Sequence, residues 1–524
     1  KSLLCEEQAG FREGYSTMDN LFVLTNLIEL KWFEGVKKIY CFFIDLKSAF
    51  DSVNRDALLF KLSHMGVSSK FIRAIASLYK DTKLSVWSKN GRSAFFPTVS
   101  GVQQGCNLSP LIFALFINDL KESLCGGVWL NGYRIKLLLY ADDIVFIADN
   151  AVILQKMIDE LEDYVTRWDL TVNLSKSNIM VFRKGGGKLS RSESWKFSKQ
   201  PIAVVNRYKY LGVTLSPTLS LSAHLNQTAR NALLGLNSVW CNLFLNQHIP
   251  LAVKYELFKS VTRSVLTYGC QVWGNQYLDK IESVQRTFIK KLFKLPKITP
   301  NYMIYLETKL TPVHVFTFEL QFKYILKTLN HVSFRLTKLV AEEVIKRRIL
   351  WYKDWIDWSK KVNCEFGEVV ISTEQGRKEL RLLKTALVTH YELSYREKAM
   401  KGVHHIIYKQ LSFDVDYANS SLNLFDIGII FKVRGELVNL NYKPFVQGRN
   451  YNCSMCNLGE VEDVFHYLGR CKVLEVMRKK YFGVTTLSES KMIDYLNGEN
   501  WTVLVSYLKE AYVYRSFLIQ NYNY

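Results

Sequence analysis

Long hydrophobic runs are missing from this sequence of 524 residues. The longest, such as Leu111–Ile117, stop well short of the roughly 20 apolar residues that cross a membrane, so we expect no membrane partner. Proline is also scarce, at nine residues, and no long Ser/Gly run occurs, which argues against extended disorder. No secretory signal opens the chain, which begins at Lys1 without a start methionine. We interpret it as an N-terminally truncated reading frame or a fragment.

Acidic residues are in deficit. The 48 Asp and Glu residues stand against 69 Lys and Arg residues, which gives a formal net charge of +21. Such a balance favours a polyanionic partner, because Lys and Arg side chains that contact phosphates release condensed counterions. The alternative is a basic surface that only keeps the chain in solution. For a chain of this size we favour nucleic acid.

Disulfide-like cysteine spacing is missing as well. The ten cysteines are scattered, which suits a reducing compartment, and we expect the nucleus and the cytoplasm. Only Cys453, Cys456 and Cys471 cluster, with His466 between them. Two thiolates, a later imidazole and a further thiolate can close a tetrahedral Zn²⁺ site. Chance clustering is the alternative, and we predict a structural zinc ion here.

Up to about residue 215 the sequence alternates short strands with helices. Ile39–Ile44 is a nearly continuous apolar run, which is typical of a strand buried on both faces. The pairs Asn90-Gly91 and Asn131-Gly132 each lie between strand-like runs, which predicts two hairpins. Periodic apolar positions predict helices over 56–65, 71–79 and 152–168.

A further helix is expected to begin near Ser109, which we interpret as its N-cap. Pro110 would then be the first helical residue, and the helix would run through Leu120. After about residue 218 helix-like stretches dominate, and the tracts 335–361 and 377–401 mix Lys and Arg with aliphatic and aromatic residues. Such a helix can bury one face and offer the other to phosphates. A merely solvated basic face is an equal alternative for either tract.

Three acidic residues lie in hydrophobic, strand-like sequence. Asp45 follows the run Ile39–Ile44, and Asp142 and Asp143 are flanked by apolar residues. Burying carboxylates without a partner is unfavourable, so a strand that keeps them normally gives them a cation. On adjacent strands they could hold two Mg²⁺ ions, one to activate a 3′-hydroxyl and one to stabilise a leaving pyrophosphate. The alternative is an acidic pair in a tight turn beside an unrelated Asp.

Five blocks around these acids occur in a recognisable order: Phe43–Asp51, Ser100–Pro110, Tyr140–Asp143, Leu170–Lys176 and Tyr210–Gly212. Together they resemble the reverse transcriptase family, and more closely its non-LTR (LINE-type) retrotransposon branch. Five blocks in the right order are a specific match, whereas any one alone is weak.

Later segments extend the resemblance. Leu266–Trp273, Ile281–Arg286 and Leu295–Lys297 look like the region that follows the palm in non-LTR elements. They separate the chain from group II intron maturases, which share the catalytic blocks. The Cys453–Cys471 segment is similar to the Cys/His segment found after non-LTR polymerase domains, rather than to a retroviral zinc knuckle.

The resemblance implies roles for individual residues. Asp45 and Asp142 would be the ligands of two Mg²⁺ ions, and Asp143 would support the site less directly. Phe50 matches the family's sugar-selecting position, where a ring would clash with a ribonucleotide 2′-hydroxyl. Ordinary core packing is the alternative for Phe50. Lys176 would protonate or neutralise the leaving pyrophosphate, with an exposed surface lysine as the alternative.

The remaining substrate-binding residues expected from the resemblance are Gln104, Gly105 and Tyr140. Gln104 and Gly105 would let the backbone approach the template–nucleotide pair closely, and Tyr140 opens the catalytic hairpin. The sequence also departs from the family, since Gln103 stands where relatives often carry Arg and Asp169 stands where many carry Gly. Basic finger segments and an endonuclease are not recognisable.

These observations predict an α+β fold. We expect a right-hand polymerase palm with an antiparallel sheet, helices and partial fingers over 1–218, and a helical thumb over 219–310. A helical basic connector over 311–445 and a Cys/His zinc segment with C-terminal helices over 446–524 would follow. The expected function is target-primed synthesis of DNA from element RNA, with an RNA template, a DNA primer or target and deoxynucleoside triphosphates as partners. The alternative is a catalytically impaired relic that only binds nucleic acid; an intron maturase ranks third.

Overall fold

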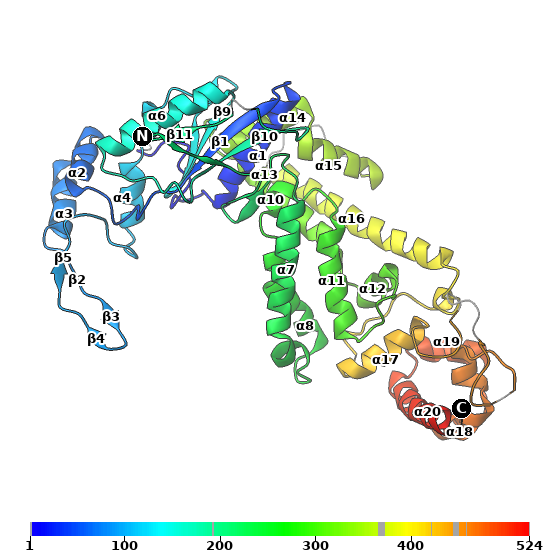
Figure 1. The fold of residues 1–524 in the computed structure, drawn as a ribbon. Helices are drawn as coiled ribbons and strands as arrows, with labels where there is room; N and C mark the ends of the chain where they lie inside the picture. The colour runs from blue at the N-terminus through cyan, green and yellow to red at the C-terminus, as the bar shows by residue number, and fades with distance from the viewer. Residues whose placement is uncertain are drawn as a thin grey trace.

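A five-stranded sheet lies at the centre of the N-terminal part of the computed structural model, which describes residues 3–190, 193–364, 373–420, 422–443, 450–456 and 458–522. The strand order is β13-β10-β1-β9-β8 (Figure 1). The strands are β1 (Lys38–Ile44), β8 (Leu137–Tyr140), β9 (Asp143–Ala148), β10 (Asn178–Arg183) and β13 (Ala203–Val204). All neighbours pair antiparallel except β10 and β13, which are parallel. The expected antiparallel sheet is therefore correct except at this edge.

The central strand β1 is buried on both faces, as its apolar run predicted. Because side chains alternate along a strand, Cys41 and Phe43 join one hydrophobic cluster, whereas Phe42 and Ile44 join a second one. Helix α1 (Thr17–Phe33) packs against the first face and α6 (Ala151–Arg167) against the second. The sheet thus forms the middle layer of an α+β sandwich.

Four short helices and a small hairpin extend from the α6 side (Figure 1). The helices are α2 (Arg55–His64), α3 (Ser69–Tyr79), α4 (Ser109–Phe116) and α5 (Leu120–Ser123). The projecting strands are β2 (Lys83–Leu84), β3 (Trp87–Ser88), β4 (Gly91–Arg92) and β5 (Phe96–Pro97). Strands β3 and β4 form the hairpin predicted here, but its turn is Lys89-Asn90, because Gly91 already pairs with Ser88 as the first residue of β4.

The prediction for α4 was wrong in two details. Leu108 occupies the cap position and Ser109 is the first helical residue, with its side chain buried and its hydroxyl 3.4 Å from that of Tyr79. The hydroxyl therefore pairs with a side chain instead of capping the backbone. The helix ends at Phe116 rather than Leu120, because the chain turns before α5 begins.

Three further hairpins complete the strands. β6 (Val128–Leu130) and β7 (Tyr133–Ile135) pair around Asn131-Gly132, as predicted, and both turn residues have positive φ. The other two hairpins are β11 (Lys196–Phe197) with β12 (Gln200–Pro201), and β14 (Tyr208–Tyr210) with β15 (Val213–Leu215).

After residue 215 the regular secondary structure of the described residues is helical, apart from an isolated bridge between Asn452 and Val461. Its α-helices are α7 (Ser222–Ser238), α8 (Leu251–Leu257), α9 (Ser264–Leu266), α10 (Cys270–Trp273), α11 (Asp279–Leu292), α12 (Asn301–Thr308), α13 (Val313–Leu329), α14 (Leu336–Arg347), α15 (Leu350–Lys361), α16 (Thr373–Lys401), α17 (Leu424–Arg434), α18 (Glu475–Phe482), α19 (Glu489–Asn497) and α20 (Trp501–Tyr522). Short π-helical or 3₁₀ turns are η1 (Trp240–Phe244), η2 (Phe258–Arg263), η3 (Tyr408–Gln410), η4 (His466–Arg470) and η5 (Lys472–Leu474).

Contacts of α1 fix this helical part to the sheet. Tyr324 of α13 donates a hydrogen bond to Asp19 at 2.8 Å, and Arg335 forms an ion pair with the same carboxylate at 3.0 Å. The indole of Trp351 donates to Asn26 at 3.1 Å. Helix α1 is therefore shared by the sheet and the helices, and one hydrophobic cluster runs through both.

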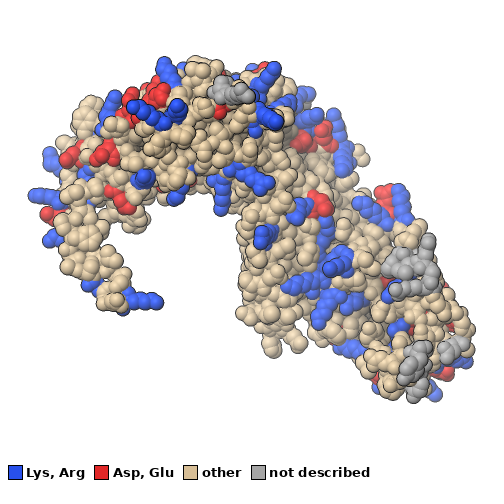
Figure 2. Space-filling model, in the orientation of Figure 1, with Lys and Arg blue, Asp and Glu red and all other residues tan. Residues whose placement is uncertain are grey.

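The space-filling view is hollowed between the β2–β5 hairpin on one side and the region of α7 on the other (Figure 2). Helices α17 to α20 lie at the far end of the helical part. No helix among the described residues is long and apolar enough to span a membrane. The expected domain boundaries stay a prediction, and the one at 445/446 lies outside the described residues.

Candidate active site and metal centre

The hairpin β8–β9 presents the acidic pair at its tip. Tyr140 pairs with Asp143 across the hairpin, so Ala141 and Asp142 form a two-residue turn. Ala141 adopts a φ of +56°, which is the left-handed conformation that tight hairpin turns use. The turn holds Asp142 at the end of the sheet.

The N-terminal segment holds this turn in place. The Gln8 side-chain oxygen accepts hydrogen bonds from the backbone nitrogens of Ala141 at 3.1 Å and Gly10 at 2.8 Å. A Cβ on Gly10 would lie 2.3 Å from the Ala141 nitrogen, so only glycine fits. Sequence reasoning missed Gln8 and Gly10, because the contact joins positions 133 residues apart.

Asp45 reaches the same edge of the sheet from β1. Ile44 pairs with Ile144 of β9, so the residue after Ile44 lies beside the start of β9 at Asp143. The Asp45 carboxylate accepts a hydrogen bond from the Asn173 side chain at 2.8 Å, and its carbonyl accepts one from the Asn173 backbone at 2.8 Å. Asn173 belongs to the block Leu170–Lys176, so that block orients Asp45.

The three carboxylates affect one another electrostatically. Desolvation, together with the negative charges of Asp142 and Asp45, raises the pKa of Asp143 to about 6. Among the described residues, none of the three has an ion-pair partner from a Lys, Arg or His side chain. The site is therefore a concentration of negative charge without a protein cation.

This donor set fits Mg²⁺. Carboxylate oxygens are the ligands that this hard cation selects, and grouping several of them is stable only when a cation offsets their repulsion. Asp45, Asp142 and Asp143 all lie at the edge where β1 and β9 adjoin. The structure thus brings together the three acids that sequence analysis singled out.

Phe50 lies in the turn after Asp45 and is half-buried. Its ring stacks on Phe113 of α4, with 4.9 Å between centroids and 25° between planes. Its carbonyl accepts a hydrogen bond from Val102 at 2.8 Å. The ring is thus held by packing on one side while part of it remains accessible.

The loop from Gly101 to Gly105 packs against the turn that carries Phe50. Gln104 is exposed and its amide donates to both carboxylate oxygens of Asp51, at 3.1 and 3.2 Å. Gly101 and Gly105 have φ values of +83° and +82°, but a Cβ on Gly101 would lie 2.7 Å from the Asp51 carbonyl oxygen, whereas one on Gly105 would meet open space. Arg55, which sequence reasoning missed, holds the loop by donating to the Gly101 carbonyl at 3.0 Å.

Two further predicted residues occupy different settings. Tyr140 is half-buried, and burial raises the pKa of its hydroxyl. Lys176 is exposed and forms no ion pair among the described residues, so its role stays a prediction beside the surface alternative.

The block Tyr210–Gly212 contacts the helical part, since the Tyr268 hydroxyl donates to the Leu211 carbonyl at 2.9 Å.

The Cys/His cluster lies far along the chain, around η4. One ligand atom from each of Cys453, Cys456, His466 and Cys471 falls within 4.8 Å of the others. The Cys453 and Cys471 sulfurs are 3.9 Å apart, and the Cys456 sulfur lies 3.6 Å from His466 Nε2. Tetrahedral Zn²⁺ with bonds of about 2.3 Å to sulfur and about 2.05 Å to nitrogen requires separations of about 3.8 and about 3.6 Å.

A partner orients the histidine of this cluster. His466 Nδ1 lies 2.7 Å from a carboxylate oxygen of Glu460, which leaves Nε2 directed at the cysteines. Zinc-ligating histidines commonly use their second nitrogen in this way. The four side chains therefore fit a zinc ion in number, type and spacing.

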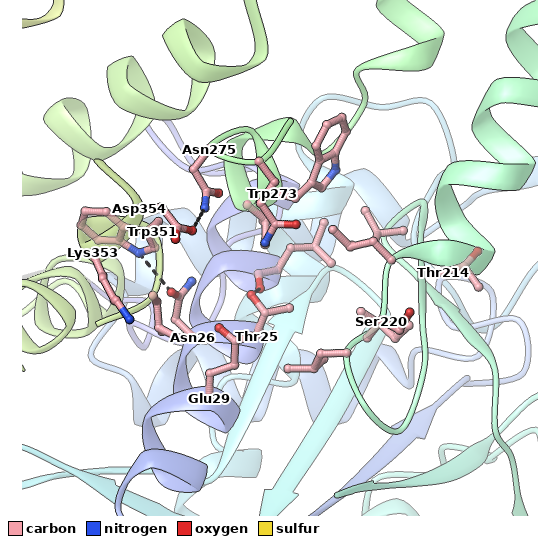
Figure 3. Close-up of a pocket in the computed structure, with 18 residues that line it drawn as sticks. Thr25, Asn26, Glu29, Thr214, Ser220, Trp273, Asn275, Trp351, Lys353 and Asp354 are labelled. Carbon is pink, nitrogen blue, oxygen red and sulfur yellow. Dashed lines mark hydrogen bonds between the residues drawn. The ribbon is translucent and has the colours of Figure 1, made fainter. Parts of the chain in front are cut away.

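A cavity of about 310 Å³ lies elsewhere, where the sheet meets the helical part (Figure 3). Asn26 and Glu29 of α1 line it opposite Asp354 of α15, which accepts a hydrogen bond from Asn275. Burial, followed by the charge of Asp354, raises the pKa of Glu29 to about 7. None of the three active-site carboxylates lines this cavity.

Comparison with known families matches residues 2–215 to the model "Reverse transcriptase (RNA-dependent DNA polymerase)". Among curated relatives, the RNA-directed DNA polymerase from mobile element jockey of Drosophila funebris is 24% identical over 298 residues, which cover 55% of this chain and 32% of the relative. The probable RNA-directed DNA polymerase from transposon BS of Drosophila melanogaster is 28% identical, covering 52% and 30%. The chain thus spans about a third of the length of these relatives.

A solved telomerase structure from Candida tropicalis is also similar, at 14% identity and a TM-score of 0.34, covering 64% of this chain and 57% of that one. The family match covers all five sequence blocks and the sheet that carries the three carboxylates. With the jockey and BS relatives, it shows that residues 2–215 form a reverse transcriptase domain similar to those of non-LTR (LINE-type) retrotransposons.

Proposed function

We propose that this protein is an RNA-directed DNA polymerase that copies element RNA into DNA by two-metal nucleotidyl transfer. The observation that carries the proposal is the meeting of Asp45, Asp142 and Asp143 at one edge of the sheet, without a protein cation. The family match and the names of the relatives support the same reaction class.

Two Mg²⁺ ions would be held by Asp45 and Asp142, with Asp143 in a supporting role. When bound, they supply activation of the primer 3′-hydroxyl and stabilisation of the departing pyrophosphate. The protein contributes positioning: Asn173 orients Asp45, and Gln8 and Gly10 hold the turn that carries Asp142. Such preorganisation matters because in-line phosphoryl transfer depends on alignment and charge stabilisation.

Substrate selection would rest on the residues around the loop 101–105. The Phe50 ring, held against Phe113, would exclude a ribose 2′-hydroxyl. Gln104 and Gly105 are exposed beside it, where they would contact the template–nucleotide pair, and Tyr140 would lie beside the primer end. Lys176 would neutralise the leaving pyrophosphate.

The parts of the fold would then act as a right hand. The sheet with its helices (1–218) would be the palm with partial fingers, and 219–310 would be the thumb. Lys and Arg residues gather around α11 on the face shown in Figure 2, which supports contact with phosphates of a primer–template duplex. The basic connector would be 311–445.

The partners would be an RNA template, a DNA primer or nicked DNA target, and deoxynucleoside triphosphates. In the segment 446–524 a structural Zn²⁺ ion would be coordinated by Cys453, Cys456, His466 and Cys471, and the spacing of their ligand atoms supports this. We place the protein in the nucleus and the cytoplasm, where reduced cysteines persist.

A primer-extension assay tests this proposal. The purified product of the complete reading frame is given a DNA primer annealed to an RNA template, deoxynucleoside triphosphates and Mg²⁺. We expect template-directed extension that stops when EDTA removes the metal. Binding of the duplex without any extension is the result that the alternative, a nucleic-acid-binding relic, predicts, and it would overturn the proposal.

A further inference from the structure

A second cavity lies far from the carboxylates, between α17, α20 and the loop that follows α11. Its volume is about 520 Å³. Apolar side chains form most of its wall, among them Ile429, Val433 and Leu508. Four segments that are separated in the sequence meet there (294–296, 425–439, Tyr467 and 508–513), so the cavity is a product of the tertiary fold.

The wall of this cavity is fixed by a buried ion pair. Arg434, at the end of α17, and Glu307 of α12 are both fully buried and lie 2.9 Å apart. Arg434 also donates to the carbonyls of Leu496 at 2.5 Å and Ser412 at 2.6 Å. Helix α17 is thus tied to α12 and α19, and the cavity is preorganised rather than dependent on a ligand to assemble it.

Positive charge surrounds the opening. Lys294, Lys432 and Lys509 all line the cavity. Lys509 pairs with Asp426, whereas Lys294 and Lys432 have no acidic partner among the described residues. Burial, followed by repulsion from Lys294, lowers the pKa of Lys432. An anion beside these two lysines would relieve that repulsion.

An aromatic ring stands between the lysines. Phe425 is 56% exposed, although it is a large apolar side chain. The amino groups of Lys294 and Lys509 each lie 5.7 Å from its ring centroid. Proteins that bind single-stranded nucleic acids use exposed rings flanked by cations, since bases stack on the ring and phosphates approach the cations.

One polar group inside the cavity lacks a partner. Tyr467 lines the wall and is 2% exposed, yet its hydroxyl forms no hydrogen bond among the described residues. A buried hydroxyl without a partner is unfavourable. A ligand with a hydrogen-bonding edge that enters the apolar cavity would satisfy it, which a purely aliphatic ligand cannot do.

We propose that this cavity binds an unpaired nucleotide of a single-stranded nucleic acid. The base stacks on Phe425 and meets the Tyr467 hydroxyl with its polar edge, while neighbouring phosphates contact Lys294 and Lys432. The site lies outside the polymerase cleft and goes beyond the proposed reaction, because it holds a strand that is not being copied at that moment.

Anisotropy of a fluorescein-labelled ten-nucleotide oligomer, U10 or dT10, tests the site in the zinc-loaded full chain. Excess unlabelled primer–template duplex occupies the polymerase cleft, and triphosphates are omitted so that polymerase activity does not enter the readout. We expect saturable binding of the oligomer under these conditions. Tighter binding of U10 identifies the natural strand as RNA, and tighter binding of dT10 identifies it as DNA.

Three variants address the three groups. Phe425→Ala should weaken binding about 5- to 150-fold, since stacking contributes about 1–3 kcal/mol per base. Tyr467→Phe should weaken it about 2- to 10-fold, the value of one hydrogen bond. The double variant Lys294→Gln, Lys432→Gln should reduce the slope of log affinity against log salt concentration by about 1.4, because each phosphate contact with a single strand contributes about 0.7 to this slope.

Matched controls come from the same region. Phe517 is 52% exposed on α20 and does not line the cavity, so Phe517→Ala should bind normally. Lys472 and Lys479 are exposed outside the cavity, and replacing both with Gln makes the same charge change. Thermal unfolding and zinc content establish that each variant folds. Unchanged binding in Phe425→Ala and Tyr467→Phe, or complete displacement of the oligomer by duplex, would overturn the proposal.

Discussion

Replacing Gly101 and Gly105 separately with alanine measures how tightly the loop 101–105 packs against the turn that carries Phe50. The two glycines have nearly the same backbone conformation, with φ of +83° and +82°. An alanine at either position therefore carries the same left-handed penalty, about 1–2 kcal/mol. What differs is the space around the added methyl group.

At Gly101 the new Cβ would lie 2.7, 2.8 and 3.0 Å from three backbone atoms of Asp51, whereas at Gly105 it meets nothing within 4 Å. Backbone cannot rotate away, and such overpacking costs about 1–3 kcal/mol. Gly101→Ala should thus lower the free energy of unfolding by about 2–5 kcal/mol and Gly105→Ala by about 1–2 kcal/mol. The backbone shift would also reach Phe50, whose carbonyl accepts a hydrogen bond from Val102.

Urea unfolding of the full chain, followed by tryptophan fluorescence, measures the difference between the variants, and primer extension measures its effect on synthesis. We expect Gly101→Ala to be less stable than Gly105→Ala and slower in synthesis than the wild type. Equal destabilisation of the two variants would show that the contact with Asp51 does not constrain the loop, and the steric reasoning would fail.

Three other predictions follow from the described side chains. Phe50→Ala should raise ribonucleotide incorporation, because the clash with the 2′-hydroxyl disappears; unchanged discrimination in a competition assay would mean that Phe50 only packs against Phe113. The purified protein should carry about one equivalent of Zn²⁺ by elemental analysis, and the double variant Cys453→Ser, Cys456→Ser should lose it. Glu29 has a pKa of about 7 in the folded protein, above the unfolded value, so its ionisation removes stability as the pH rises from about 4.5 to about 7. As the pH rises from 4.5 to 8, the free energy of unfolding of Glu29→Gln should therefore increase by up to about 3 kcal/mol relative to that of the wild type. A difference between the two proteins that does not change with pH would contradict the burial of Glu29.

The sequence predicted the elements whose pattern is local. The apolar run Ile39–Ile44 became the buried central strand, and Asn131-Gly132 became a hairpin turn, because side-chain alternation and positive φ are properties of adjacent residues. The other predicted hairpin also formed, with its turn one residue earlier at Lys89-Asn90. The α+β class and the family followed from such blocks in order. The cap of α4 was misplaced by one residue, since the Ser109 hydroxyl pairs with Tyr79 from a distant helix.

The candidate site was predictable only in part. Asp45, Asp142 and Asp143 could be named because charge in apolar strand sequence is conspicuous. The residues that position them, Gln8 and Asn173, could not, because ordinary polar side chains acquire this role only through long-range contacts. The cavity beside Phe425 is a still clearer case, since it joins four segments that no local pattern connects.

The most direct test of the account compares the wild type with Asp142→Asn in RNA-templated primer extension with Mg²⁺, alongside duplex affinity measured on the same preparations. Asparagine has nearly the same shape but removes the negative charge that would hold the metal. We expect extension to be abolished while duplex affinity stays nearly intact, because we propose Asp142 as a metal ligand rather than a phosphate contact. Undiminished extension by Asp142→Asn would contradict it.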